Sequence, residues 1–437
     1  MPFVLTGLLA GCNAASALEF TPGIGAGLEY TDNAALTAKD TDNDLLMIGF
    51  VGARINENDG PLTAAATTTF RRLHYTKDTF SDQNYFTLGA VAGWEMIADR
   101  VDWDLRNYFT QRKVNALDPD TPDNTQNTNV FSLGTNIATP LSERQQIVIY
   151  PEFRDYYYEN SDTDNRQYKL SANWFYRLFP TASAGLGGSA RKIDYDDDDK
   201  NPDATFYGIN GTFSGTRVRS EYNFNLGYTE VRRDHFDDQS GVAGSLVWLY
   251  RLTGRSTARL YAASELTDTN TGLYNSEANP DNGDFSNEQI SGDVLRDNIM
   301  RLSYARQGTT QQINIWGEWR DLDYKEAPDD RKVKTIGAAY NYRVTAFLTT
   351  GVYGSYSRTK QTDTRYKDKR KTIGGNLGYN LTRNLCTNFD IRYRKKNANT
   401  ARDDYDEFGA FVSLIYGFGG VQGKGIRSYH TCDYYTD

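Results

Sequence analysis

Apolar residues recur at every second position near the C-terminal end of the sequence. Each even-numbered residue from Phe408 to Phe418 is apolar. A period of two residues is typical of a β-strand with one apolar face. A run of about eleven residues also matches the roughly nine to eleven that a transmembrane β-strand needs. This stretch therefore predicts one membrane-spanning strand.

The same alternation recurs along the chain in about twenty segments, beginning with Leu18–Tyr30, Leu45–Asn56 and Leu62–Tyr75. The connectors between segments are alternately short and long, and the long ones, such as Thr31–Asp44, are mostly acidic. Outer-membrane barrels have short periplasmic turns and long external loops. The pattern predicts an all-β fold, namely a transmembrane antiparallel up-and-down β-barrel of about 20 strands, within a range of roughly 18–22.

Composition supports this fold over a soluble enzyme. Only 38% of the 437 residues are hydrophobic, yet aromatic residues reach 13%. No run of about eighteen apolar residues exists that would form a transmembrane helix. The chain is too polar for a conventional core of this size but suits a barrel with a wet interior. A net charge of −9 disfavours nucleic acid as a partner.

One face of each predicted strand is apolar, and the other carries charged residues. A charge on the lipid face costs about 2–4 kcal/mol at the bilayer midplane. The charged rows should therefore face the lumen, and Trp and Tyr near the strand ends should form interfacial girdles. The predicted pore-lining residues are Asp102, Arg106, Glu152, Arg154, Arg219, Glu221, Arg259, Arg301, Glu318, Arg320 and Arg392.

A barrel of sixteen or more strands leaves an aqueous channel. The sequence thus predicts a porin-like channel for passive passage of hydrophilic solutes, unless a loop folds inward. Val114–Gln126 and Thr267–Gln289 are the candidate plugs. The charged wall has two interpretations: arginines that favour anions, or ion pairs that stiffen the wall, as the spacing of Glu152 with Arg154 and of Glu318 with Arg320 suggests.

Enzymatic chemistry is not expected. The three histidines are His74, His235 and His430, and only His235 has aspartates close by in the sequence. No serine motif accompanies it, so a solvated loop histidine is the simpler interpretation. We expect no cofactor and no metal site, since no acidic loop has the spacing of a calcium-binding loop. These loops could still contact lipopolysaccharide through divalent cations.

The two ends of the sequence suggest export to the bacterial outer membrane. Residues 1–17 have the apolar core and the Ala15-Ser16-Ala17 cleavage site of a signal peptide. Leu9-Ala10-Gly11-Cys12 also matches a lipobox, which would acylate Cys12. Residues 18–418 form the predicted barrel, and 419–437 form a C-terminal tail. Phe418 is the predicted aromatic signal for the barrel assembly machinery, with outer-membrane lipid as the other partner.

Two segments resemble a known family. Gly25-x-Gly27-Leu28-Glu29-Tyr30-Thr31-Asp32-Asn33 and Arg301-Leu302-Ser303-Tyr304-Ala305-Arg306-Gln307-Gly308 are similar to outer-membrane β-barrel porins found beside exopolysaccharide and exosortase loci of Gram-negative bacteria. The resemblance covers most of 18–418. It implies an outer-membrane channel and, as an alternative function, an exopolysaccharide-export channel that works with periplasmic polysaccharide-export components.

Overall fold

The structure is a computed structural model that describes residues 18–197, 199–234, 236–278, 290–362, 364–400 and 403–417. The predictions for the signal peptide, Cys12, His235, Phe418 and the 419–437 tail lie outside these residues.

Twenty strands and two short helices account for the described fold. The strands, in chain order, are β1 (Glu19–Thr31), β2 (Asp44–Glu57), β3 (Leu62–Tyr75), β4 (Gln83–Ile97), β5 (Val101–Lys113), β6 (Thr125–Ser142), β7 (Gln145–Tyr158), β8 (Asn165–Phe179), β9 (Ala182–Tyr195), β10 (Ala204–Arg217), β11 (Ser220–Arg233), β12 (Gln239–Thr253), β13 (Ser256–Asp268), β14 (Val294–Gln307), β15 (Gln311–Tyr324), β16 (Arg331–Arg343), β17 (Leu348–Gln361), β18 (Lys367–Asn380), β19 (Leu385–Ala398) and β20 (Tyr405–Gly417). The helices are η1 (Pro122–Asn124) and α1 (Thr269–Ala278). No helix among the described residues has the length and apolarity needed to cross a bilayer.

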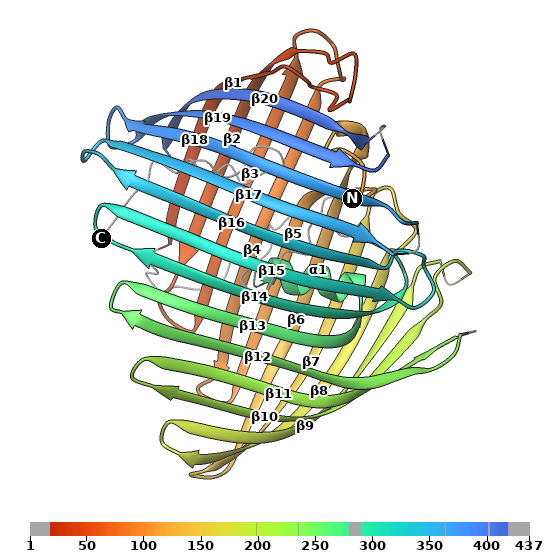
Figure 1. The fold of residues 1–437 in the computed structure, drawn as a ribbon. Helices are drawn as coiled ribbons and strands as arrows, with labels where there is room; N and C mark the ends of the chain where they lie inside the picture. Colours follow the sequence, from red (N-terminus) through yellow and green to blue (C-terminus); the bar gives the residue numbers. More distant parts are fainter. Residues whose placement is uncertain are drawn as a thin grey trace.

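The sheet closes on itself. Each strand pairs antiparallel with its neighbours in the chain, and β1 pairs with β20 from Gly23 opposite Gly417 to Thr31 opposite Gly409. Figure 1 shows the resulting barrel. Closure leaves no strand edge exposed, which is a requirement for a sheet in lipid. The predicted antiparallel β-barrel and its strand number are confirmed.

Short turns and long loops lie at opposite ends of the barrel, as the connector pattern predicts. Residues 143–144, 180–181 and 218–219 form tight turns at one end, whereas 32–43 and 114–124 form long connections at the other. Ser214, Gly215 and Thr216 are typical turn residues, but here they continue the ladder of β10, which ends at Arg217.

The two faces of the sheet have opposite chemistry. On β1 and β20, the outward Leu28 and Leu414 are exposed, whereas the inward Glu29 and Ile415 are buried. The outward face carries aromatic residues near the turns, with Trp94 opposite Trp103 in the sheet. Alternation along each strand produces this division, since successive side chains point to opposite faces.

Some inward-facing aromatic rings occupy the space that a glycine on the neighbouring strand leaves free because it has no side chain. Trp316 of β15 lies directly opposite Gly337 of β16. A Cβ atom built on Gly337 would lie 2.2 Å from Cζ2 of the Trp316 ring. The indole therefore occupies space that only glycine leaves open, and the pair joins two neighbouring strands on the lumen face.

We predict that Gly337→Ala lowers the free energy of unfolding by about 1–3 kcal/mol, because the added methyl group forces the Trp316 ring out of its position. The midpoint of denaturant unfolding, followed by heat-modifiable gel migration in detergent, measures the change. Gly89→Ala is the matched control, since Gly89 is also in a strand and a Cβ there meets nothing within 4 Å. Equal midpoints for both variants would contradict this account of the Trp316 contact.

Candidate functional site: the inward loop and the charged lumen wall

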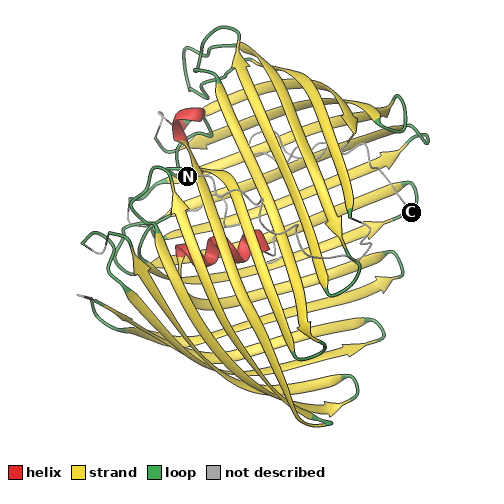
Figure 2. Cartoon of the chain, turned by 180° about the vertical axis from the view of Figure 1, so that it is seen from behind, coloured by secondary structure: helices red, strands yellow, loops and turns green. Residues whose placement is uncertain are grey.

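The loop between β13 and β14 carries α1, which lies inside the barrel. Figure 2 shows this helix inside the barrel, between opposite walls. Its Leu273 and Tyr274 are buried in an apolar cluster. The other members of the cluster belong to both walls and to the loop itself: Val130, Tyr156 and Tyr158 from β6 and β7, Leu295, Leu322 and Tyr324 from β14 and β15, and Ile290. The helix is therefore held by wall strands that are distant from each other in the sheet.

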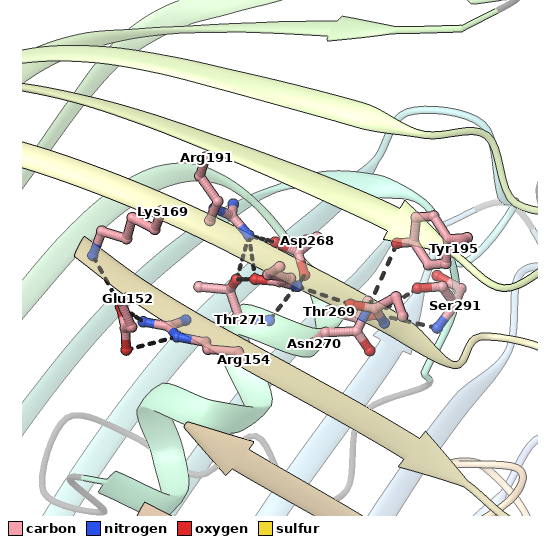
Figure 3. Close-up of polar contacts among 12 residues, drawn as sticks. Glu152, Arg154, Lys169, Arg191, Tyr195, Asp268, Thr269, Asn270, Thr271 and Ser291 are labelled. Atoms are coloured by element: carbon pink, nitrogen blue, oxygen red, sulfur yellow. Dashed lines mark hydrogen bonds and ion pairs between the residues drawn. The ribbon is translucent and has the colours of Figure 1, made fainter. Parts of the chain in front are cut away.

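An ion pair fixes the start of α1. Asp268, at the end of β13, pairs with Arg191 of β9, and its side chain is only 1% exposed. The Asp268 Oδ1 atom also accepts a 2.9 Å hydrogen bond from the backbone N–H of Thr271. A carboxylate in this position caps a helix N-terminus. The Arg191 Nη1 atom donates further bonds to Thr271 Oγ1 at 2.5 Å and to Gln167 Oε1 at 3.0 Å (Figure 3).

Further polar contacts hold the helix along its length. The Tyr158 hydroxyl donates a 2.6 Å hydrogen bond to Asn270 Oδ1. The Tyr274 hydroxyl lies 3.2 Å from Ser132 Oγ, and burial raises the pKa of Tyr274. The Arg154 guanidinium lies 4.0 Å from the centroid of the Tyr274 ring, a cation–π contact. Near the end of the helix, Glu277 pairs with Arg112 of β5.

A second loop, between β5 and β6, reaches another part of the wall. The Lys396 Nζ atom of β19 donates a 2.6 Å hydrogen bond to the Leu117 carbonyl. Asn124 holds this loop together through bonds to the Asn115 backbone at 2.8 and 2.9 Å. Because β19 does not pair with β5 or β6, the loop connects strands that the sheet itself does not join. Both loops that the sequence singled out thus contact the wall of a distant strand.

Many charged residues of the inward face form ion pairs. Arg154 and Glu152 make a bidentate pair with two 2.9 Å hydrogen bonds, and both side chains are nearly inaccessible. Arg106 makes a similar pair with Asp104. Arg392 of β19 pairs with Glu29 of β1 and, at 3.4 Å, with Glu407 of β20. The last set of contacts ties together three strands at the closure of the barrel.

Glu318 and Arg320, which their spacing on β15 suggests as a pair, both contact charged residues of the neighbouring strand β14. Glu318 lies 3.1 Å from Arg301, its cross-strand partner. Arg320 donates a 2.9 Å hydrogen bond from Nε to Asp297 Oδ1. Cross-strand partners are as close as residues two apart on one strand, so the register decides which pair forms.

The remaining predicted wall residues are distributed between the lumen face and the turn end. Asp102 Oδ2 accepts a 3.2 Å hydrogen bond from Asn136 Nδ2. Glu221 pairs with Arg251, and Arg259 lies 6.0 Å from the Tyr261 ring centroid. Arg219 lies in the exposed turn between β10 and β11 rather than within a strand.

The sequence did not identify the residues that hold the inward loop. Arg191 follows Gly187 and Ser189 on the inward row of its strand, and that alternation was its only signal. Asp268 stands at the boundary of a strand and a long loop, where an acidic residue is common. Tyr156 and Tyr158 belong to the apolar cluster around α1, and Tyr108 packs against it.

The described residues contain no group of three or more His, Cys, Asp or Glu side chains placed to hold a metal ion. The Nδ1 atom of His74 lies 2.7 Å from Asp82 Oδ1 on the exposed outer surface. The candidate site is thus a lumen lined by charged side chains and partly filled by α1.

No protein-family model and no curated protein matches the sequence. The fold is similar to solved outer-membrane proteins. One is the siderophore receptor PirA from Pseudomonas aeruginosa, with a TM-score of 0.45 and 10% identity over 92% of this chain and 80% of that one. Another is the FrpB iron transporter from Neisseria meningitidis, with a TM-score of 0.46 and 11% identity over 92% of this chain and 83% of that one. A third is OmpTdeltaL8, a loop-deletion mutant of an outer-membrane protein of Vibrio cholerae, with a TM-score of 0.37 and 10% identity over 92% of this chain and 100% of that one. The link to exopolysaccharide loci stays a prediction. With its closed sheet and apolar outer face, the chain is a twenty-stranded β-barrel of the bacterial outer membrane.

Proposed function

We propose that the barrel is a porin-like channel for small hydrophilic solutes, narrowed by the loop that carries α1. The observation that carries this proposal is the seating of α1 inside a wall of paired charges. Charged, hydrogen-bonding walls solvate hydrophilic solutes during passage. The inward loop then limits the size of what can pass.

The dimensions favour narrowing over complete filling by α1. Twenty strands spaced about 4.8 Å apart and tilted by about 40° would close a circular barrel roughly 40 Å across. An α-helix with its side chains is about 10–12 Å wide. The helix packs against part of the wall, as its contacts with β5–β9 and β13–β15 indicate.

Export of a polymer is the other function suggested by the sequence. A polysaccharide chain would have to pass the inward loop, and α1 is anchored at both ends by ion pairs with Arg191 and Arg112. Because a helix fixed at both ends would obstruct a polymer, these anchors favour the passage of small solutes over polymer export. Deletion of the gene separates the two functions: loss of small-solute uptake supports the channel, whereas loss of polymer secretion alone would support export.

We predict that Asp268→Asn raises single-channel conductance or the frequency of conductance steps in planar bilayers. The substitution leaves Arg191 buried without its carboxylate partner. Breaking a buried ion pair in this way lowers the free energy of unfolding by about 3–5 kcal/mol. The weakened anchor should release α1 from the wall.

Asp297→Asn is the matched control for this experiment. It removes the same charge from another inward ion pair, in which Asp297 of β14 contacts Arg320 of β15. The control should change stability without adding conductance steps. Identical traces for both variants would contradict the gating role of the anchor, and no conductance in any variant, loop deletions included, would contradict the channel.

We also predict that the wild-type channel discriminates weakly between K⁺ and Cl⁻, because the wall arginines are paired with carboxylates. Glu152→Gln should shift the reversal potential in a KCl gradient toward anion selectivity, since it leaves the charge of Arg154 uncompensated. Glu230→Gln, which breaks an exposed pair with Arg232 on the outer face, is the control and should leave the reversal potential unchanged. A strongly selective wild type would contradict the paired-wall interpretation.

A further inference from the structure

Eight cationic side chains gather on the outward face of four neighbouring strands, β16–β19, at the ends that lead into the long loops. Seven of them are exposed and Lys395 is half-buried. We call this group the basic patch: Lys332, Lys334, Arg358, Lys360, Lys367, Lys369, Lys371 and Lys395. Figure 1 shows that these four strands lie side by side in one wall.

The basic patch begins where the apolar outer band ends. Ile373 is 65% exposed and lies opposite Tyr393, which also faces outward. The next outward pair along the same strands is Lys371 opposite Lys395. From Ile373 to Leu381, which lies just past the end of β18, the outward face spans about nine residues, enough to cross the hydrocarbon. The cations therefore lie at the level of the lipid headgroups on the side of the long loops, which is the external side.

Stability of the sheet does not explain the basic patch, because like charges face each other across strands. Lys360 lies between Lys332 and Lys367, and Arg358 lies between Lys334 and Lys369, in register. Like charges directly opposite each other in a sheet are destabilising. A bound anion would offset this repulsion.

Carboxylates lie only at the two margins of the basic patch within the described chain. Lys332 pairs with Asp321 of β15 at 2.7 Å. On the other side, Lys395 lies opposite Asp406 of β20. The six cations between them form no ion pair with a described residue.

Several outward cations elsewhere on the barrel have carboxylate partners. Examples are Arg166 with Asp155 and Asp196, Lys192 with Asp194 and Asp203, and Arg232 with Glu230. The centre of the basic patch differs from these paired cations in having no carboxylate partner among the described residues, in a chain with a net charge of −9.

We propose that the basic patch binds the phosphate groups of a phosphorylated glycolipid of the outer leaflet, the lipid A part of lipopolysaccharide. The phosphates would lie among Arg358, Lys369 and Lys371, at the centre. The acyl chains would lie along the apolar band that includes Ile336 and Ile373, both more than half exposed. Lysine and arginine are suited to phosphate, and the ligand reaches them from within the membrane plane.

The test compares lipid binding of the wild type with that of a triple variant, Arg358→Gln, Lys369→Gln and Lys371→Gln. Native mass spectrometry measures retention of bis-phosphorylated lipid A by the purified barrel. We expect roughly a hundredfold weaker binding by the triple variant, given the contribution of each basic residue near an anionic surface. Dephosphorylated lipid A should bind the wild type as weakly as it binds the variant.

Arg166→Gln, Lys192→Gln and Arg232→Gln form the matched control, because they remove three outward cations that have carboxylate partners. The control should retain lipid A like the wild type. Heat-modifiable gel migration verifies folding, and if the triple variant fails to fold, Lys369→Gln alone should still weaken binding about fivefold.

Three results would overturn the proposal. The first is equal retention of lipid A by the wild type and the triple variant. The second is an equal loss of lipid A binding in the triple variant and the control variant. The third is equal binding of phosphorylated and dephosphorylated lipid A by the wild type. A further measurement adds millimolar inorganic phosphate to the wild-type protein with bound lipid A. Displacement of the lipid at that concentration would identify a site for free phosphate, whereas retention supports the lipid.

Discussion

Closure of the sheet between β1 and β20 is the constraint on which the rest of the structure depends. In the hydrocarbon region a backbone N–H or C=O without a partner costs several kcal/mol, so a sheet must have no edge. The nine-residue register from Gly23–Gly417 to Thr31–Gly409 meets this requirement. The same closure places the Arg392–Glu29 pair across the join, so that inward charges reinforce the seam that backbone pairing creates.

Closure also explains why charge is arranged differently inside and outside the barrel. Inside, side chains from distant strands and from the loop with α1 meet in a confined space, so a buried charge needs a partner close by. Asp268 with Arg191 and Glu152 with Arg154 are the result. Outside, side chains reach water or lipid headgroups, and cations such as Lys369 stay exposed without a carboxylate from the described protein.

The sequence predicted those features that depend on a single strand. The period of two residues located β3 at Leu62–Tyr75 to the residue, and the lengths of the connectors predicted the two ends of the barrel. It could not predict contacts that depend on register. The spacing suggests a pair of Glu318 with Arg320 on β15, but only the alignment of β15 with β14 reveals that Arg301 and Asp297 contact them. Arg191 and Asp268 meet only because α1 enters the barrel, which no local pattern records.

The inward loop and the basic patch follow from one physical rule applied to two environments. A charge is stable where its environment supplies an opposite charge or water. In the lumen the protein itself supplies the partner, and Asp268 then both neutralises Arg191 and caps α1. On the outer face of β16–β19 the cross-strand register places cations against cations, so that the partner must come from the surroundings. At the level of the headgroups, an anionic lipid is the component of the membrane that can supply it.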